Sequence, residues 1–183
     1  DNANMYWKSI FSMKVGLLGY GHIGKDIHNI LLQNHIETAT IDRGNEYENI
    51  HLVNSLEELI KYCDLIICSV PKTPKTDNLF NKEMLALMEE KFIVNVGRSN
   101  VINEKELYEV LKNKQIGGAA IDTWEEKPKN KRTKLMPSEY SFHDLNNIIL
   151  SPHAAMRVKN GHERYVMDVT QNVIGLITKG EVY

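Results

Sequence analysis

The feature that most constrains this 183-residue chain is a glycine-rich turn between a short apolar run and an amphipathic segment. Residues 13–19 read MKVGLLG, which is typical of a buried strand, and residues 19–24 read GYGHIG. From residue 23 to residue 33 apolar side chains recur at helical spacing. The chain therefore carries the pattern G-x-G-x-x-G at a strand-to-helix junction, where a helix N-terminus offers free N–H groups to a phosphate.

Each glycine of this turn has its own expected role. Gly19 would allow the tight turn, and Gly21 would let the backbone approach a pyrophosphate group. Gly24 would let the helix pack closely on the strand. The pattern alone is weak, but its position at the end of the first predicted strand predicts that the chain binds a dinucleotide.

An acidic residue at the end of the second predicted strand indicates which dinucleotide. This strand spans residues 36–42, and Asp42 follows the glycine turn at about the spacing of a ribose-binding carboxylate. A carboxylate there accepts hydrogen bonds from ribose hydroxyls and repels the extra phosphate of NADP, so we expect NAD. Arg43 is a contrary sign, because an arginine can pair with a 2′-phosphate, but we expect it to flank the adenine or the pyrophosphate.

Apolar, β-branched runs alternate with helical segments along most of the chain. Further strands are predicted over residues 64–70, 92–96, 118–122 and 147–150, and helices over residues 55–62, 79–89, from 103 onward and 158–179. This alternation predicts an α/β fold with a Rossmann-type, doubly wound, mostly parallel sheet and helices on both faces. Residues 125–147 interrupt the rhythm and are predicted to form a long, basic surface loop. We assign residues 1–12 to a linker and residues 13–183 to the dinucleotide-binding domain.

Composition argues against several classes of partner. Lys plus Arg is 22 and Asp plus Glu is 24, so neither nucleic acid nor an anionic membrane surface is expected as a partner. No apolar run reaches the ~18 residues of a membrane span. The histidines are scattered and predict no metal site. Cys63 and Cys68 are predicted to be reduced packing residues, which fits a cytoplasmic protein.

Four longer motifs follow in the second half of the chain. Residues 64–76 read DLIICSVPKTPKT, residues 92–106 read FIVNVGRSNVINEKE, residues 116–124 read IGGAAIDTW, and residues 147–155 read NIILSPHAA. In this order they resemble the cofactor domain of the D-isomer-specific 2-hydroxyacid dehydrogenases. The resemblance covers nearly the whole chain and is far more specific than the glycine pattern.

The resemblance implies two catalytic residues. Arg98 would bind the carboxylate and carbonyl of a small 2-keto acid, although Ser99 stands where the family has a glycine. His153 would be the acid–base residue. The chemistry is consistent, because a guanidinium grips a carboxylate with two bonds and a histidine titrates near neutrality.

The resemblance also implies cofactor contacts beyond the glycine turn. Asp122 would contact the nicotinamide carboxamide, and Val70 and Pro71 would lie on the adenine side. The full set of implied NAD-binding residues is Gly19, Gly21, His22, Ile23, Gly24, Asp42, Arg43, Val70, Pro71, Thr76, Val96, Gly97, Asp122, His153 and Ala155.

One catalytic position departs from the family. The family has a glutamate shortly after that aspartate and just before a proline, where this chain has Lys127. Glu126 precedes it, and Asp144 is a weaker candidate. A carboxylate beside the histidine favours the protonated form that carbonyl reduction needs, whereas a lysine disfavours it. We hypothesise either that Glu126 substitutes or that activity is weak.

A second departure concerns the architecture of the whole protein. Family members carry another lobe before the cofactor domain, and the substrate lies between the two. The chain begins with Asp1 and shows no such lobe, so we expect a part of a longer dehydrogenase. We expect it to bind NAD and to catalyse poorly alone, because one wall of the cleft is absent. The resemblance also implies a homodimer formed through the cofactor domain.

Three functions compete at this point. The leading hypothesis is the NAD-binding domain of an oxidoreductase that transfers a hydride between NAD(H) and a small 2-hydroxy or 2-keto acid. The alternative is a non-catalytic, NAD(H)-responsive interaction module like the corepressors of this fold, which Lys127 slightly favours. A third is the cofactor domain of an adenosylhomocysteine hydrolase, to which the arginine and Ser-Pro-His motifs fit less well.

Overall fold

The computed structural model of the chain describes residues 8–44, 47–124, 138–155 and 159. The chain divides into two compact units, residues 1–152 and 153–183, and the helices and strands described below belong to the first. In the second unit the described residues are 153–155 and 159. Within these described ranges, no helix is both long enough and apolar enough to cross a membrane.

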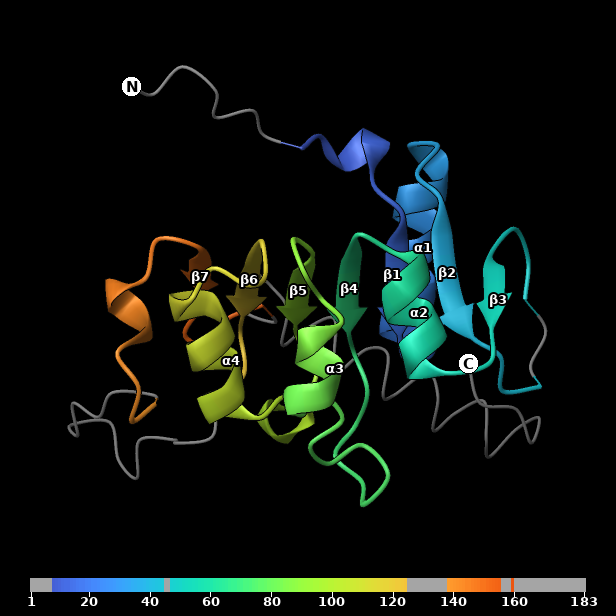
Figure 1. Cartoon of the computed structure of the whole chain (residues 1–183). Helices are drawn as coiled ribbons and strands as arrows, with labels where there is room; N and C mark the ends of the chain where they lie inside the picture. Colours follow the sequence, from blue (N-terminus) through green and yellow to red (C-terminus); the bar gives the residue numbers. More distant parts are fainter. Residues whose placement is uncertain (1–7, 45–46, 125–137, 156–158, 160–183) are drawn as a thin grey trace. The chain divides into compact units, whose positions relative to one another are not determined.

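The first unit is built on a seven-stranded parallel sheet (Figure 1). Its strands are β1 (Val15–Leu18), β2 (Thr38–Ile41), β3 (His51–Val53), β4 (Leu65–Cys68), β5 (Phe92–Asn95), β6 (Gly118–Ile121) and β7 (Ile148–Leu150). They lie in the order β3-β2-β1-β4-β5-β6-β7, and every pairing between them is parallel. The predicted Rossmann-type fold is confirmed, with the described sheet wholly rather than mostly parallel.

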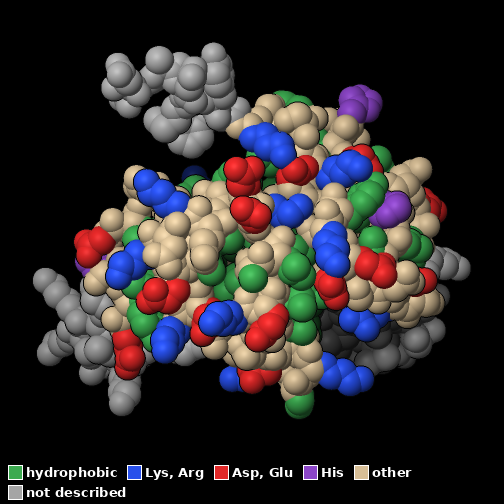
Figure 2. Space-filling model, viewed as in Figure 1, with side chains coloured by type: hydrophobic (Ala, Val, Ile, Leu, Met, Phe, Trp, Pro, Cys, Tyr) green, Lys and Arg blue, Asp and Glu red, His purple; other side chains and the backbone are tan. Residues whose placement is uncertain are grey.

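Helices cover both faces of this sheet. They are α1 (His22–Gln33), α2 (Leu56–Tyr62), α3 (Lys82–Ala86) and α4 (Glu104–Lys112), with short 3-10 turns at Ile10–Ser12, Ser99–Val101 and Phe142–Asp144. In Figure 1, α2, α3 and α4 lie in front of the sheet and α1 lies behind it. On the front face, positive and negative side chains are interspersed rather than gathered by sign (Figure 2).

The core has a layer on each side of the sheet. The larger cluster includes Leu59 of α2, Leu85 of α3 and Leu107 of α4. The smaller cluster joins residues of β1 to Leu31 of α1. Since β1 and its helix carry the glycine turn, this smaller layer fixes the element on which the candidate site is built.

Side-chain caps begin two of the helices where the sequence predicts them. At α2, the Ser55 hydroxyl accepts a hydrogen bond from the Glu58 N–H at 3.1 Å. At α4, the Asn103 amide oxygen accepts from the Glu106 N–H at 3.1 Å. Such caps satisfy N–H groups that have no partner within the helix. Both predicted helix starts are therefore confirmed.

Two elements differ from the expectation in length or in existence. The helix expected over residues 79–89 is the five-residue α3, whose first turn is capped by Asn81. The three-residue strand β3 was not predicted, because His51–Val53 is too short to show a periodic pattern. The helix expected over residues 158–179 lies outside the described residues, apart from Lys159.

Two side chains in the described end of the expected surface loop, residues 138–147, are buried instead. Phe142 is only 2% exposed, and its ring lies edge-on to Trp124 and to Tyr108, with centroids 5.7 and 5.4 Å away. The Ser138 hydroxyl donates to the Glu104 carboxylate at 2.8 Å. The surface-loop prediction is therefore wrong for Ser138 and Phe142, which are buried against α4, whereas the side chains of residues 139, 141, 143, 144 and 146 are exposed as expected. Residues 125–137 lie outside the described ranges.

We expect Phe142→Ala to lower the free energy of unfolding by about 3–5 kcal/mol, because it empties the centre of this aromatic cluster. Urea unfolding followed by circular dichroism measures the change. His143→Ala is the matched control. The His143 side chain is next to Phe142 in sequence but is exposed, so its removal should lower the free energy of unfolding by less than about 0.5 kcal/mol. A Phe142 effect as small as that of the control would contradict the packing described here.

Candidate functional site

The predicted cofactor-binding and catalytic residues of the first unit follow the carboxyl ends of the parallel strands, which meet at one edge of the sheet. The glycine turn follows β1, Asp42 follows β2, Val70 follows β4, Arg98 follows β5 and Asp122 follows β6. The strand order reverses between β1 and β4, and ligands of open parallel sheets bind at such switch points. With strands ~4.8 Å apart, the edge from β1 to β6 extends about 14 Å.

The glycine turn has the geometry that its sequence predicts. Gly19 has a φ of +108°, a left-handed conformation that side chains disfavour. A Cβ on Gly24 would lie 2.0 Å from the carbonyl oxygen of Gly19, so helix α1 approaches the end of β1 as closely as a glycine allows. A Cβ on Gly21 would meet nothing within 4 Å. The N-terminus of α1 has no side-chain cap, which leaves its first N–H groups available to a phosphate.

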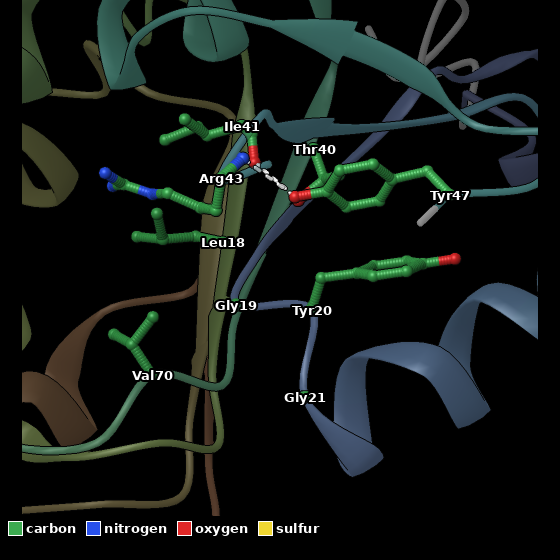
Figure 3. A pocket seen from close by; sticks show the side chains of 9 residues that line it. All are labelled: Leu18, Gly19, Tyr20, Gly21, Thr40, Ile41, Arg43, Tyr47 and Val70. Carbon is green, nitrogen blue, oxygen red and sulfur yellow. Dashed lines mark hydrogen bonds between the residues drawn. The ribbon is translucent and has the colours of Figure 1, made fainter. Parts of the chain in front are cut away.

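A cavity of about 260 Å³ opens beside this turn (Figure 3). It is lined by residues from the ends of three neighbouring strands and their loops: Leu18, Gly19, Tyr20, Gly21, Thr40, Ile41, Arg43, Tyr47 and Val70. The side chains of Arg43 and Val70 extend to one side, and the rings of Tyr20 and Tyr47 lie on the other. Apolar side chains, aromatic rings and one cation therefore surround a space next to the helix N-terminus.

Asp42 stands beside this cavity rather than in its lining. Its side chain is exposed, and its Oδ1 accepts a hydrogen bond from the Gly44 N–H at 2.8 Å. Its own N–H donates to the Val53 carbonyl at 2.9 Å, which ties the end of β2 to β3. The carboxylate thus has a fixed position at the end of β2.

Three ring side chains beside the turn were not predicted from the sequence. The Tyr20 and Tyr47 rings have centroids 5.3 Å apart, and the Tyr20 ring lies 5.7 Å from that of His28. His28 is 3% exposed, with Nδ1 2.7 Å from the Thr38 hydroxyl and Nε2 3.1 Å from the Glu48 carbonyl. Burial raises the pKa of Tyr20, and the charges of Glu48 and Tyr47 add to the increase, so its hydroxyl stays protonated near neutral pH.

The loop that carries Arg98 is held by a buried amide. Asn95 is 1% exposed; its side chain accepts from the Gly97 N–H at 3.1 Å and donates to the Arg98 carbonyl at 3.0 Å. A Cβ on Gly97 would lie 2.8 Å from the Val70 carbonyl oxygen, so the ends of β4 and β5 pack closely. Arg98 itself is exposed, and its Nη1 donates to the Gly97 carbonyl at 2.9 Å. The backbone is fixed while much of the guanidinium faces solvent.

Asp122 is buried at the end of β6. Its Oδ1 accepts from the Ser151 hydroxyl at 2.5 Å, and its N–H donates to the Asn95 carbonyl at 3.0 Å. The Trp124 indole N–H donates to the Ser151 carbonyl at 2.9 Å. These bonds join the ends of β5, β6 and β7.

Other predicted residues have more peripheral or purely structural contacts. The Thr76 hydroxyl donates to the Pro71 carbonyl at 2.6 Å and accepts from the Thr73 N–H at 2.8 Å, so it organises its own loop. His22 and Ile23 are exposed at the start of α1, and Val96 is half-buried. No group of three or more potential metal ligands occurs among the residues that the structure describes.

The second unit contains the predicted acid–base residue. His153 is exposed and has a φ of +55°, and Ala155 is also exposed. Glu126 and Lys127 lie outside the described residues. Asp144, the weaker candidate carboxylate of the first unit, is exposed and lies 3.5 Å from His143 Nε2. The identity of the carboxylate partner of His153 therefore stays a prediction.

A known protein family matches most of this chain. The model of the D-isomer specific 2-hydroxyacid dehydrogenase, NAD binding domain, matches residues 1–155. D-3-phosphoglycerate dehydrogenase of Methanocaldococcus jannaschii is 33% identical over 150 residues, which are 79% of this chain and 27% of that protein. Glyoxylate reductase of Pyrococcus furiosus is 30% identical over 184 residues, 94% of this chain and 50% of that protein.

Solved structures agree with these relatives. A D-lactate dehydrogenase from Sporolactobacillus sp. superposes with a TM-score of 0.83 at 26% identity, over 98% of this chain and 57% of that one. An acyclic imino acid reductase in complex with NADPH and D-Arg superposes with a TM-score of 0.78 at 25% identity, over 94% of this chain and 53% of that one. The chain spans about half the length, or less, of the curated relatives it matches.

Two glycine substitutions separate the packing role of the turn from its binding role. Gly24→Ala should lower the free energy of unfolding by about 1–3 kcal/mol or more, because its Cβ would collide with the Gly19 carbonyl. Gly21→Ala should unfold within about 1 kcal/mol of the original chain, yet bind NADH at least about tenfold more weakly, because its Cβ would enter the space that the pyrophosphate needs. Urea unfolding and NADH fluorescence titration measure the two effects. Unimpaired NADH binding by Gly21→Ala would contradict the placement of the phosphates.

Proposed function

The chain belongs to the D-isomer-specific 2-hydroxyacid dehydrogenase family as its NAD-binding domain, and from that premise we propose that the protein transfers a hydride between NAD(H) and a small 2-keto or 2-hydroxy acid. The observation that carries this proposal is the pair of hydrogen bonds formed by the Asn95 side chain. They hold the Arg98 backbone at the same sheet edge as the glycine turn. A phosphate-binding turn alone serves many functions. An exposed guanidinium on a loop that is held at the same sheet edge suits a carboxylate substrate.

The residues at the sheet edge fit NAD. The uncapped start of α1 and the open space at Gly21 suit the pyrophosphate, and the neighbouring cavity suits the adenosine. We propose that Asp42 accepts hydrogen bonds from the ribose hydroxyls, which favours NAD over NADP. We place the carboxamide of the nicotinamide near Asp122, at the other end of the site. Bound NAD(H) supplies or accepts the hydride.

We assign substrate binding to Arg98. Its planar guanidinium would form two parallel hydrogen bonds with the substrate carboxylate and polarise the neighbouring carbonyl. The exposure of its side chain leaves the guanidinium accessible to a substrate. The hydrogen bonds of Asn95 hold the loop that carries it, so little entropy is lost in ordering this loop when the substrate binds.

We assign the proton to His153, on the strength of its Pro-His-x-Ala motif. In the direction of reduction, the imidazolium would give its proton to the substrate's carbonyl oxygen, and in oxidation the neutral ring would take it back. We propose that Glu126 is the carboxylate that orients this ring, in the place of the family's glutamate.

Assembly and location complete the proposal. We propose a homodimer formed through the cofactor domain, and the exposed Ile30 of α1 offers apolar surface for such a contact. Sedimentation equilibrium measures the oligomeric state.

We also propose a cytoplasmic location, which is supported by Cys63 and Cys68, since both are free and buried.

The direct test is titration of the chain with NADH and NADPH, followed by fluorescence, and then addition of glyoxylate, hydroxypyruvate or pyruvate. We expect NADH to bind more tightly than NADPH, and NADH oxidation to be slow in the chain alone, because water has access to the reaction site. Failure to bind either nucleotide would refute the proposed function.

Substitution of Arg98 separates substrate binding from cofactor binding. Arg98→Gln should lower kcat/KM by about a hundredfold or more, because one charged donor to the substrate is lost, while the Kd for NADH changes less than about twofold. Lys112→Gln, which removes a charge from the end of α4, is the control. Equal activity in the Arg98 variant and the control would show that the substrate carboxylate binds elsewhere.

A further inference from the structure

The turn after β2 presents two consecutive backbone N–H groups at the ribose end of the proposed cofactor site. They belong to Arg43 and Gly44, and Gly44 has a φ of +72°. Successive N–H groups in a turn of this kind form a concavity that binds anions. Such a concavity next to Asp42 is placed to receive the 2′-phosphate that distinguishes NADP from NAD.

In this chain both N–H groups already have a partner. The Asp42 carboxylate accepts from the Gly44 N–H at 2.8 Å. The Tyr47 hydroxyl accepts from the Arg43 N–H at 2.8 Å, and both of these residues are drawn in Figure 3. The same hydroxyl donates to the Ile41 carbonyl at 3.4 Å. A 2′-phosphate at this turn would therefore have to displace a carboxylate and a phenol before it gained a hydrogen bond.

The Tyr47 hydroxyl is held in this place by its ring. The ring packs against Tyr20, which in turn lies against the buried ring of His28. Thr38 and the Glu48 carbonyl bind the two nitrogens of His28. Release of the Arg43 N–H would thus disturb a cluster of three rings rather than rotate one free side chain.

The Arg43 side chain is the group near this turn that would favour NADP. Its side chain lines the cavity, and within the part of the chain that the structure describes its guanidinium forms no ion pair. A cation in this position would by itself attract a 2′-phosphate. The filled turn and the negative charge of Asp42 oppose that attraction.

We infer that Tyr47 is a specificity-determining residue, whose hydroxyl disfavours NADP by occupying the Arg43 N–H that a 2′-phosphate needs. The inference rests on the proposed function and deepens it, because it names the group that excludes the second cofactor. Asp42 supplies charge repulsion, and Tyr47 removes the hydrogen-bond donor that would offset the repulsion.

The test is Tyr47→Phe in the full chain, which keeps the ring and removes only the hydroxyl. Titrations with NADH and NADPH are compared with titrations using adenosine 5′-monophosphate and adenosine 2′,5′-bisphosphate, which differ only in the 2′-phosphate. We expect the Kd of the two 2′-phosphorylated ligands to fall about tenfold, the effect of one hydrogen bond to a charged group, and the other two to change less than about twofold. Asp42→Asn combined with Tyr47→Phe should shift the preference further.

Tyr62→Phe is the matched control, because its hydroxyl binds Glu37 near the amino ends of the strands, at the opposite edge of the sheet. Thermal unfolding verifies that each variant is folded. The inference is overturned if Tyr47→Phe leaves the NADPH-to-NADH ratio unchanged, whatever the double variant does, or if the original chain binds both dinucleotides equally. Loss of all nucleotide binding in the original chain would instead refute the proposed function, and this inference with it.

Discussion

The close approach of α1 to the end of β1 is the contact on which the rest of the site depends. The Gly24 Cα lies so near the Gly19 carbonyl that a Cβ there would be 2.0 Å from the oxygen. This approach brings the free N–H groups at the start of α1 to the strand edge, where the sheet order reverses. The partial positive charge of the helix and the cavity beside β1 therefore belong to one site.

Beyond this turn, buried and half-buried polar side chains hold the loops of the sheet edge. Asn95 fixes the Arg98 loop, Thr76 closes its own loop, and Ser151 joins β7 to Asp122. A buried donor or acceptor without a partner costs about 1–3 kcal/mol, so the bonds of Asn95 oppose any rearrangement of the Arg98 loop. The edge gains a defined shape before any ligand arrives, which lowers the entropic cost of binding.

The sequence predicts those parts of the molecule whose causes are local. The caps at Ser55 and Asn103 depend on residues three positions apart, and the glycine turn depends on six consecutive residues. Strand β3 and the packing of Phe142 depend instead on neighbours distant in sequence, β2 in one case and Trp124 and Tyr108 in the other. No periodic pattern in a single segment contains that information.

The same division applies to the candidate site. The motifs predict Asp42 and Arg98 as functional positions, but they do not predict that Asn95 binds the Arg98 loop or that Tyr47 binds the Arg43 N–H. Both of these act through backbone atoms, which leave no residue-type signature at the position that they serve. A side chain that binds a ligand must have a particular chemistry, whereas a backbone N–H is present at almost every residue.

Cofactor binding and turnover therefore place different demands on this chain. The residues that we propose to contact the adenosine and the pyrophosphate belong to β1, β2, β4 and their loops, which lie within one compact unit. Reduction of a carbonyl further requires a proton donor and the exclusion of water, and these need more than the contacts of the glycine turn. Because the chain spans about half the length of its relatives or less, affinity for the nucleotide is the property that its own residues determine most completely.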